Sequence, residues 1–119
     1  MGDAQCLNNA ALENLQKMAG AQFAIKMIDL FFATVPPKLA ELQPAFSAGN
    51  YHQVQDVAHF IKSSCRNIGA VAMQETSARL EQAAREGKVD ALPGLLQEME
   101  EAYASVKVAL EEQRRKLSA

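Results

Sequence analysis

The sequence predicts an all-α protein: an antiparallel four-helix bundle with an additional short N-terminal helix. Three observations support this fold. Apolar residues recur at the three- and four-residue spacing of amphipathic helices along most of the chain. No segment shows a convincing alternation of apolar and polar residues, which is the mark of a half-buried strand. Glycine, proline or asparagine separates the helical segments, and long helices joined by such short loops pack as antiparallel neighbours.

The first helix is expected over about Asn9 to Met18, with Asn8 or Asn9 as its N-cap. Its leucines, Leu12 and Leu15, point inward, and Gly20 ends it. We expect this short helix to pack across one end of the bundle.

The second helix carries five large apolar residues on one predicted face: Phe23, Met27, Leu30, Phe31 and Val35. The pair Pro36-Pro37 is expected to kink or divide the helix, because each proline lacks a backbone donor and crowds the preceding turn. The helix then resumes toward Gly49-Asn50.

The third helix contains His59 and ends near Gly69. Its narrow apolar stripe consists of Val54, Val57, Ala58, Ile61, Cys65 and Ile68. A fourth helix follows through Leu80 to Glu86, with Gly87 as its left-handed terminator.

Asp90 is the expected N-cap of the last helix. Seven residues of this helix share its inward face: Leu92, Leu95, Leu96, Met99, Tyr103, Val106 and Leu110. The charged tail, residues 111–119, either extends the helix into solvent or frays. The whole chain, 1–119, is expected to be one domain, with residues 1–8 and 112–119 as the segments open to fraying.

Composition excludes several classes of function. The formal net charge of -2 gives no broad basic field, so a nucleic-acid partner is not expected. The N-terminus lacks a basic segment followed by an apolar run, and no apolar stretch is long enough to cross a bilayer. We therefore expect a cytoplasmic protein without a membrane partner. Cys6 and Cys65 lie far apart in sequence and are expected to remain reduced.

His59 is the most informative residue of the chain. At about 100° per residue it points roughly 140° away from the centre of the apolar stripe, toward water. Lys62 and Ser63, three and four residues later, share this outward face. His52 and Arg66 lie about two turns away on either side. An exposed imidazole beside cations and a small residue suits the handling of a phosphoryl group.

Residues 58–70 read Ala-His-Phe-Ile-Lys-Ser-Ser-Cys-Arg-Asn-Ile-Gly-Ala, with Leu80-Glu81 and Gly87 downstream. This segment resembles the histidine-containing phosphotransfer (HPt) domain. The usual pattern there is alanine-histidine, any residue, leucine, lysine, glycine or serine, serine, and then glycine-alanine. The resemblance is dense over about Val57 to Gly87.

The resemblance implies a phosphocarrier in a multistep two-component phosphorelay. His59 would accept a phosphoryl group from a receiver-domain aspartate and pass it to another receiver domain. The implied partners are the receiver domains of a hybrid histidine kinase and of a response regulator. Lys62 would neutralise the phosphoryl oxygens, and Ser63 would leave room for the partner. The resemblance also implies a monomer with no cofactor of its own and no ATP-dependent kinase activity, with Mg²⁺ bound by the partner receiver domain.

The chemistry of imidazole supports this interpretation independently. A free imidazole titrates near pH 6.5, so an exposed histidine is mostly neutral and nucleophilic at cytoplasmic pH without an activating base. Attack through Nε2 on an aspartyl phosphate gives a phosphoramidate that is reactive enough to be passed on.

Three positions near the histidine differ from the commonest residue of the family, and one of them, Ile61 in place of leucine, keeps a similar volume. Ser63 stands where glycine is commonest, and Glu81 stands where some members carry a glutamine that contacts the histidine. A carboxylate at Glu81 would orient His59 by accepting a hydrogen bond from Nδ1, but its charge would disfavour an adjacent phosphoryl group. Arg85 would compensate if it reaches the same surface.

Four exposed residues around the histidine are expected to contact the partner: Gln55, Asp56, Phe60 and Arg66. The alternative function is a phosphorylation-independent interaction module that binds a kinase or response regulator, but the intact His59 and Lys62 argue against it. A kinase dimerisation domain would carry an acidic residue directly after its histidine, where this chain has Phe60. A metal site is not expected, because His52 and His59 lie more than about 10 Å apart along the helix axis.

Overall fold

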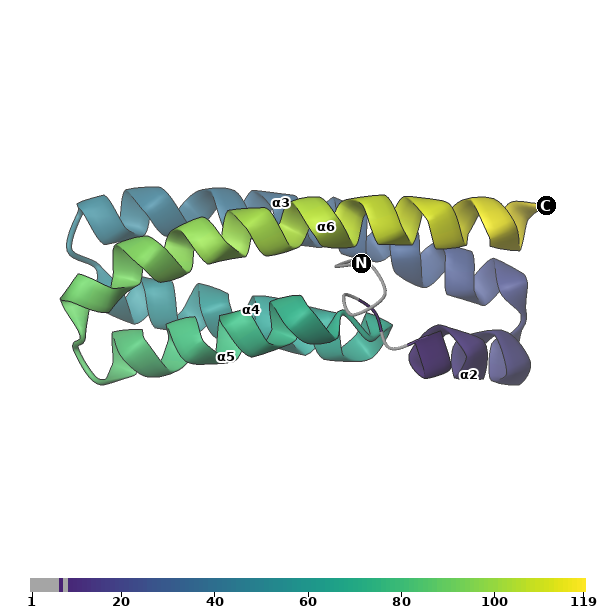
Figure 1. Ribbon diagram of the computed structural model, residues 1–119, viewed down its shortest axis with the longest axis horizontal. Helices are drawn as coiled ribbons and strands as arrows, with labels where there is room; N and C mark the ends of the chain where they lie inside the picture. Colours follow the sequence, from purple (N-terminus) through teal and green to yellow (C-terminus); the bar gives the residue numbers. More distant parts are fainter. Residues whose placement is uncertain (1–6, 8) are drawn as a thin grey trace.

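The computed structural model describes residue 7 and residues 9–119, and every regular element in these residues is helical. The elements are α2 (Asn9–Ala19), α3 (Ala21–Ser47), α4 (Tyr51–Ile68), α5 (Val71–Arg85), the 3₁₀ turn η1 (Val89–Ala91) and α6 (Leu92–Ser118). Helices α3 to α6 run antiparallel to their neighbours in sequence and form an elongated bundle (Figure 1). Helix α2 packs against α3 near one end. The predicted fold class is confirmed.

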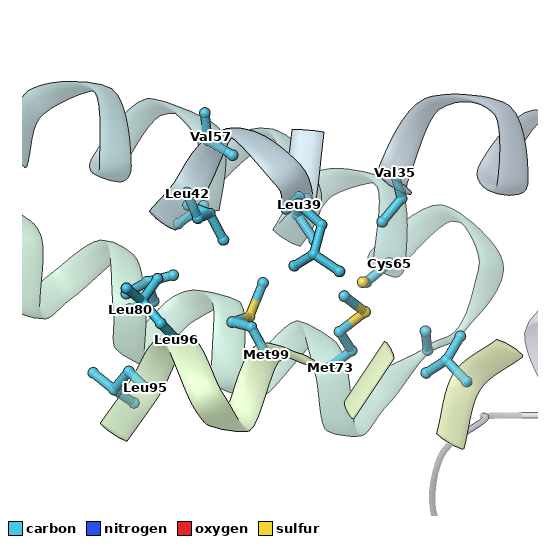
Figure 2. Close-up of a cluster of buried hydrophobic side chains, with 14 of the residues drawn as sticks. Val35, Leu39, Leu42, Val57, Cys65, Met73, Leu80, Leu95, Leu96 and Met99 are labelled. Carbon is cyan, nitrogen blue, oxygen red and sulfur yellow. The ribbon is translucent and has the colours of Figure 1, made fainter. Parts of the chain in front are cut away.

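The core lies between the four long helices, each of which contributes an apolar stripe (Figure 2). The stripe predicted for α4 is buried in full, from Val54 to Ile68. Cys65 belongs to it, and burial raises the pKa of its thiol to about 12, so the thiol stays protonated. Cys6 and the Asn8 cap position lie outside the described residues.

Two residues fix the ends of α4 and therefore the position of His59. The Asn50 side chain caps the helix by accepting a hydrogen bond from the backbone N–H of Gln53 at 3.2 Å. Gly69 ends the helix in the left-handed conformation, with φ of 79°, and Ala70 N–H donates to the carbonyl of Cys65 at 2.9 Å. Gly87 also has a positive φ, as predicted, just after α5.

The predicted inward face of α3 is wrong in its first half. Phe23 and Leu30 are 41% and 53% exposed, whereas Ala24, Ile25 and Ile28 are buried. The first half of α3 extends past the end of α4 and lies beside α2 and α6 instead (Figure 1). The neighbouring helices therefore select a different face of α3 from the one that the largest apolar residues suggested.

Helix α3 continues unbroken across its three prolines, Pro36, Pro37 and Pro44. A proline removes one intrahelical hydrogen bond, but Val35, Leu39 and Leu42 are buried on both sides of the pair. Packing against the bundle thus holds the helix together, and the division at Pro36-Pro37 does not occur.

The predicted start of α6 is also wrong. Asp90 lies within η1, and the N-cap of α6 is Ala91, without a side-chain cap hydrogen bond. Pro93 in the first turn lacks the N–H that a cap would satisfy. At the other end, residues 112–118 continue α6 rather than fray, and Arg114 forms a two-pronged ion pair with Asp29 of α3 at 2.7 and 3.0 Å.

Replacing Gly69 with alanine is expected to lower the free energy of unfolding by about 1–2 kcal/mol, because a Cβ atom disfavours positive φ. Gly94→Ala is the matched control: Gly94 lies within α6 and an added Cβ would meet open space. That variant should keep or gain stability, by up to about 1 kcal/mol. Urea denaturation of the three proteins measures both effects, and equal stability of Gly69→Ala and the parent would contradict the argument.

Candidate functional site

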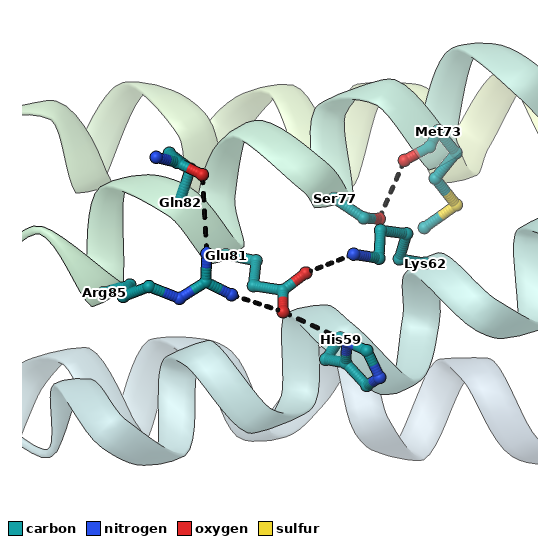
Figure 3. A network of polar contacts seen from close by, with 7 residues as sticks. All are labelled: His59, Lys62, Met73, Ser77, Glu81, Gln82 and Arg85. Carbon is teal, nitrogen blue, oxygen red and sulfur yellow. Dashed lines mark hydrogen bonds and ion pairs between the residues drawn. The ribbon is translucent and has the colours of Figure 1, made fainter.

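Glu81 of α5 is the centre of the polar cluster around His59 (Figure 3). Its Oε1 accepts a hydrogen bond from Lys62 Nζ at 2.7 Å. Its Oε2 lies 3.0 Å from His59 Nδ1 and 3.0 Å from Arg85 Nη2. One carboxylate therefore joins two residues of α4 to a third on its own helix.

The Glu81 carboxylate is ionised although the residue is only 6% exposed. Burial by itself would raise the pKa of Glu81. Hydrogen bonds and charge from Lys62 and His59 outweigh burial and hold the pKa below its usual value. The geometry thus supplies the partners that a buried charge requires.

The ionised Glu81 selects one tautomer of His59. A carboxylate without a proton is only an acceptor, so the hydrogen bond to it must come from an N–H at His59 Nδ1. In the neutral ring the lone pair then resides on Nε2. The His59 side chain is 61% exposed, as the helical spacing predicted, so the nucleophilic nitrogen belongs to an accessible ring.

Lys62 and Ser63 are less exposed than His59. The Lys62 side chain is 21% exposed and its ammonium is held by Glu81. Ser63 is partly buried on the same helix. In the unphosphorylated structure the cation beside His59 is thus already bound to an anion, an arrangement that the sequence did not specify.

The residues expected to contact a partner lie on both flanks of α4. Asp56 and Arg66 are exposed, and Gln55 is partly buried. Asp56 pairs with His52 at 3.4 Å, one turn before His59. Phe60 is 39% exposed.

A series of polar contacts beside Phe60 was not predicted from the sequence. Lys38 Nζ of α3 lies 5.4 Å from the centre of the Phe60 ring and 3.5 Å from Glu41. Glu41 in turn accepts from Gln53 of α4 at 3.3 Å. Lys38 and Phe60 are 22 positions apart on different helices, so no local sequence pattern predicts this contact.

Within residue 7 and residues 9–119, no group of three or more His, Cys, Asp or Glu side chains is placed to hold a metal ion. None of the helices in the same described part is both long and apolar enough to cross a membrane.

A family model described as the Hpt domain matches residues 26–109, a span that includes His59, Lys62 and Glu81. The chain belongs to the Hpt domain family. No curated protein sequence matches the chain. Among solved structures, the HPt domain described here is similar to histidine-containing phosphotransfer protein B (HptB) from Pseudomonas aeruginosa PAO1, with 27% identity and a TM-score of 0.89 over 95% of this chain and 97% of that one.

The fold of this HPt domain also matches a putative histidine-containing phosphotransfer protein from rice. The TM-score is 0.83 over 100% of this chain and 89% of the rice chain, at 15% identity. At that identity the similarity establishes the helical bundle alone.

Glu81→Gln should remove part of the acid sensitivity of the fold. The pKa of Glu81 is lower in the folded protein than its ordinary value of 4.5. Ionised Glu81 therefore stabilises the fold above about pH 4.5, and this contribution is lost as the pH falls through the lower, folded-state pKa. We expect the variant to be less stable at pH 7 by about 1–3 kcal/mol, and the difference to shrink as the pH falls below 4.5.

Urea denaturation between pH 2.5 and 7 measures this difference. Glu100→Gln, at an exposed position of α6, is the matched control and should follow the parent protein across the range. A gap between Glu81→Gln and the parent that stays constant with pH would show that Glu81 contributes no ionised pair to stability.

Proposed function

We propose that His59 is the phosphoryl acceptor of this histidine phosphotransfer domain. It receives the group from a receiver-domain aspartate in a multistep two-component phosphorelay and passes it to a second receiver domain. The observation that carries the proposal is the exposed imidazole with Nδ1 bonded to the ionised Glu81, since this leaves the lone pair on Nε2. Membership of the Hpt domain family supports the same role.

The transfer step needs no proton movement at His59. The Nε2 lone pair forms the N–P bond as the P–O bond to the receiver aspartate breaks, and that bonding pair leaves with the aspartate carboxylate. Nδ1 keeps its proton, so the ring gains a positive charge that faces Glu81. Onward transfer reverses these changes, with a neutral imidazole as the leaving group.

Lys62 supports this chemistry as the nearby cation. Its position one turn after His59 suits it to neutralise the oxygens of the phosphoryl group during transfer. Ser63, with its short side chain, leaves space for the partner's active site on the same outward face.

The partners in this proposal are receiver domains of a hybrid histidine kinase and of a response regulator. They dock over the exposed side of α4, where Gln55, Asp56, Phe60 and Arg66 supply contacts. The domain acts as a monomeric phosphocarrier in the cytoplasm and does not phosphorylate itself from ATP. It needs no cofactor of its own, and Mg²⁺ is bound by the receiver.

His59→Gln is expected to abolish phosphorylation by every receiver that phosphorylates the parent chain. Intact mass spectrometry at neutral to alkaline pH detects the phosphoryl adduct, which should be acid-labile. His52→Gln is the matched control, because His52 is an exposed histidine two turns earlier on the same helix, and it should accept phosphate as the parent does. A His59→Gln adduct would refute the assignment, and equally tight receiver binding without any transfer would favour the interaction-module alternative.

Lys62→Ala should lower the maximal rate of transfer by about tenfold or more, because a cation that offsets developing charge is lost. Lys107→Ala, at an exposed position of α6, removes the same charge elsewhere and should leave the rate unchanged. Single-turnover measurements at saturating phosphorylated receiver give the rate directly. An unaltered maximal rate in Lys62→Ala would exclude the proposed role of the lysine.

A further inference from the structure

We infer that Arg85 is a positioning residue that holds Glu81 so that Lys62 is released to the phosphoryl group. This inference rests on the proposed function of His59. The hydrogen bonds of Arg85 are to Glu81 and Gln82 rather than to the His59 ring. It acts through Glu81, to which it donates from Nη2 at 3.0 Å.

Two anionic groups compete for Lys62: the Glu81 carboxylate and the phosphoryl group carried by His59. The Lys62 ammonium lies 2.7 Å from Glu81 Oε1 in the unphosphorylated protein. A phosphoryl group on His59 Nε2 brings further negative charge to a site one turn away and competes for the same ammonium. If Lys62 moves to the phosphoryl group, Glu81 loses a cation while its side chain remains only 8% exposed. Leaving a buried carboxylate unpaired is strongly unfavourable.

Arg85 resolves this conflict because it binds the other side of the carboxylate. Its Nη2 and His59 Nδ1 both bond Oε2, whereas Lys62 bonds Oε1 (Figure 3). When Lys62 leaves, Glu81 keeps a permanent cation in the guanidinium and a second positive neighbour in the phosphorylated ring. Lys62 is then free to serve the phosphoryl oxygens.

The placement of Arg85 suits this role. It lies one turn after Glu81 on α5, and its Nη1 is 3.5 Å from Gln82 Oε1. Its side chain is 51% exposed, so the guanidinium is bound to the buried carboxylate from the solvent side. Two other charged pairs near α4 lie apart from this carboxylate: His52 with Asp56, and Lys38 with Glu41.

The test uses phosphoryl transfer from a phosphorylated receiver to the parent protein, Arg85→Gln and Arg85→Lys. Rates measured over a range of receiver concentrations separate the maximal rate from the half-saturating concentration. We expect Arg85→Gln to lower the maximal rate by on the order of tenfold, with little change in the half-saturating receiver concentration. A loss of this size is typical of the coupling between residues of one hydrogen-bond network. Arg85→Lys keeps the charge and should recover most of the rate.

Double-mutant cycles identify the route of the effect. In Arg85→Gln, Lys62 is expected to stay on Glu81, so adding Lys62→Ala should cost much less there than in the parent. In Glu81→Gln, no buried anion needs Arg85, so adding Arg85→Gln should cost almost nothing. An equal cost of Lys62→Ala with and without Arg85 would overturn the inference.

Two further outcomes have distinct meanings. If Arg85→Gln raises only the half-saturating concentration, and does so equally in the Glu81→Gln background, Arg85 contacts the receiver instead and the inference fails. If the parent protein accepts no phosphoryl group, or His59→Gln accepts one, the proposed function fails before the cycle begins. Circular dichroism and urea denaturation of each variant identify any loss of rate that comes from unfolding.

Discussion

The buried carboxylate of Glu81 is the interaction on which the arrangement of the site depends. A charge with so little exposure is stable only when donors surround it, and three side chains provide them: His59, Lys62 and Arg85. Each of the three is thereby fixed in position relative to the other two. The carboxylate also connects α5 to α4, because His59 and Lys62 belong to α4 (Figure 3). The orientation of the His59 ring and the ion pair of Lys62 thus both follow from the need to pair the buried Glu81 carboxylate.

The scaffold supplies rigidity without enclosing the site. Helix α4 packs against both α3 and α5, and its apolar stripe is buried along its whole length. The opposite face is left for solvent, with His59 exposed near the middle of the helix. A phosphoryl donor that is itself a folded domain can approach an exposed imidazole on a helix face, whereas a recessed imidazole would be out of its reach. An open helix face therefore suits transfer between two macromolecules.

A carboxylate at position 81, in place of a neutral amide, adds a negative charge beside His59. A neutral amide could accept the hydrogen bond of His59 Nδ1 without adding charge beside the phosphoryl group. Glu81 adds that charge, and the chain places Arg85 one turn later, with Nη2 on the same oxygen as the imidazole. The guanidinium therefore lies against the charge that the glutamate introduces, which is the basis of the inferred role of Arg85.

The sequence by itself determined the features that depend on local spacing. The helical period places His59 opposite the buried stripe of α4, and Gly69 and Gly87 mark helix ends because they tolerate positive φ. Only the tertiary structure decided which residues meet across helices. Glu81 lies 22 positions from His59, and its contact requires the register of α5 against α4.

Dependence on neighbouring helices also explains why the inward face of α3 was predicted wrongly and why the contact of Lys38 with Phe60 was missed. Phe23 and Leu30 are exposed because the ends of neighbouring helices, rather than residue type, decide which face of α3 is covered. Lys38 over Phe60 depends on how α3 crosses α4. Periodicity along one helix carries no information about the register of its neighbours. Resemblance to the HPt pattern indicated the contact of Glu81 with His59, whereas the pairing of Lys62 with Glu81 and the contact of Lys38 with Phe60 were not predicted.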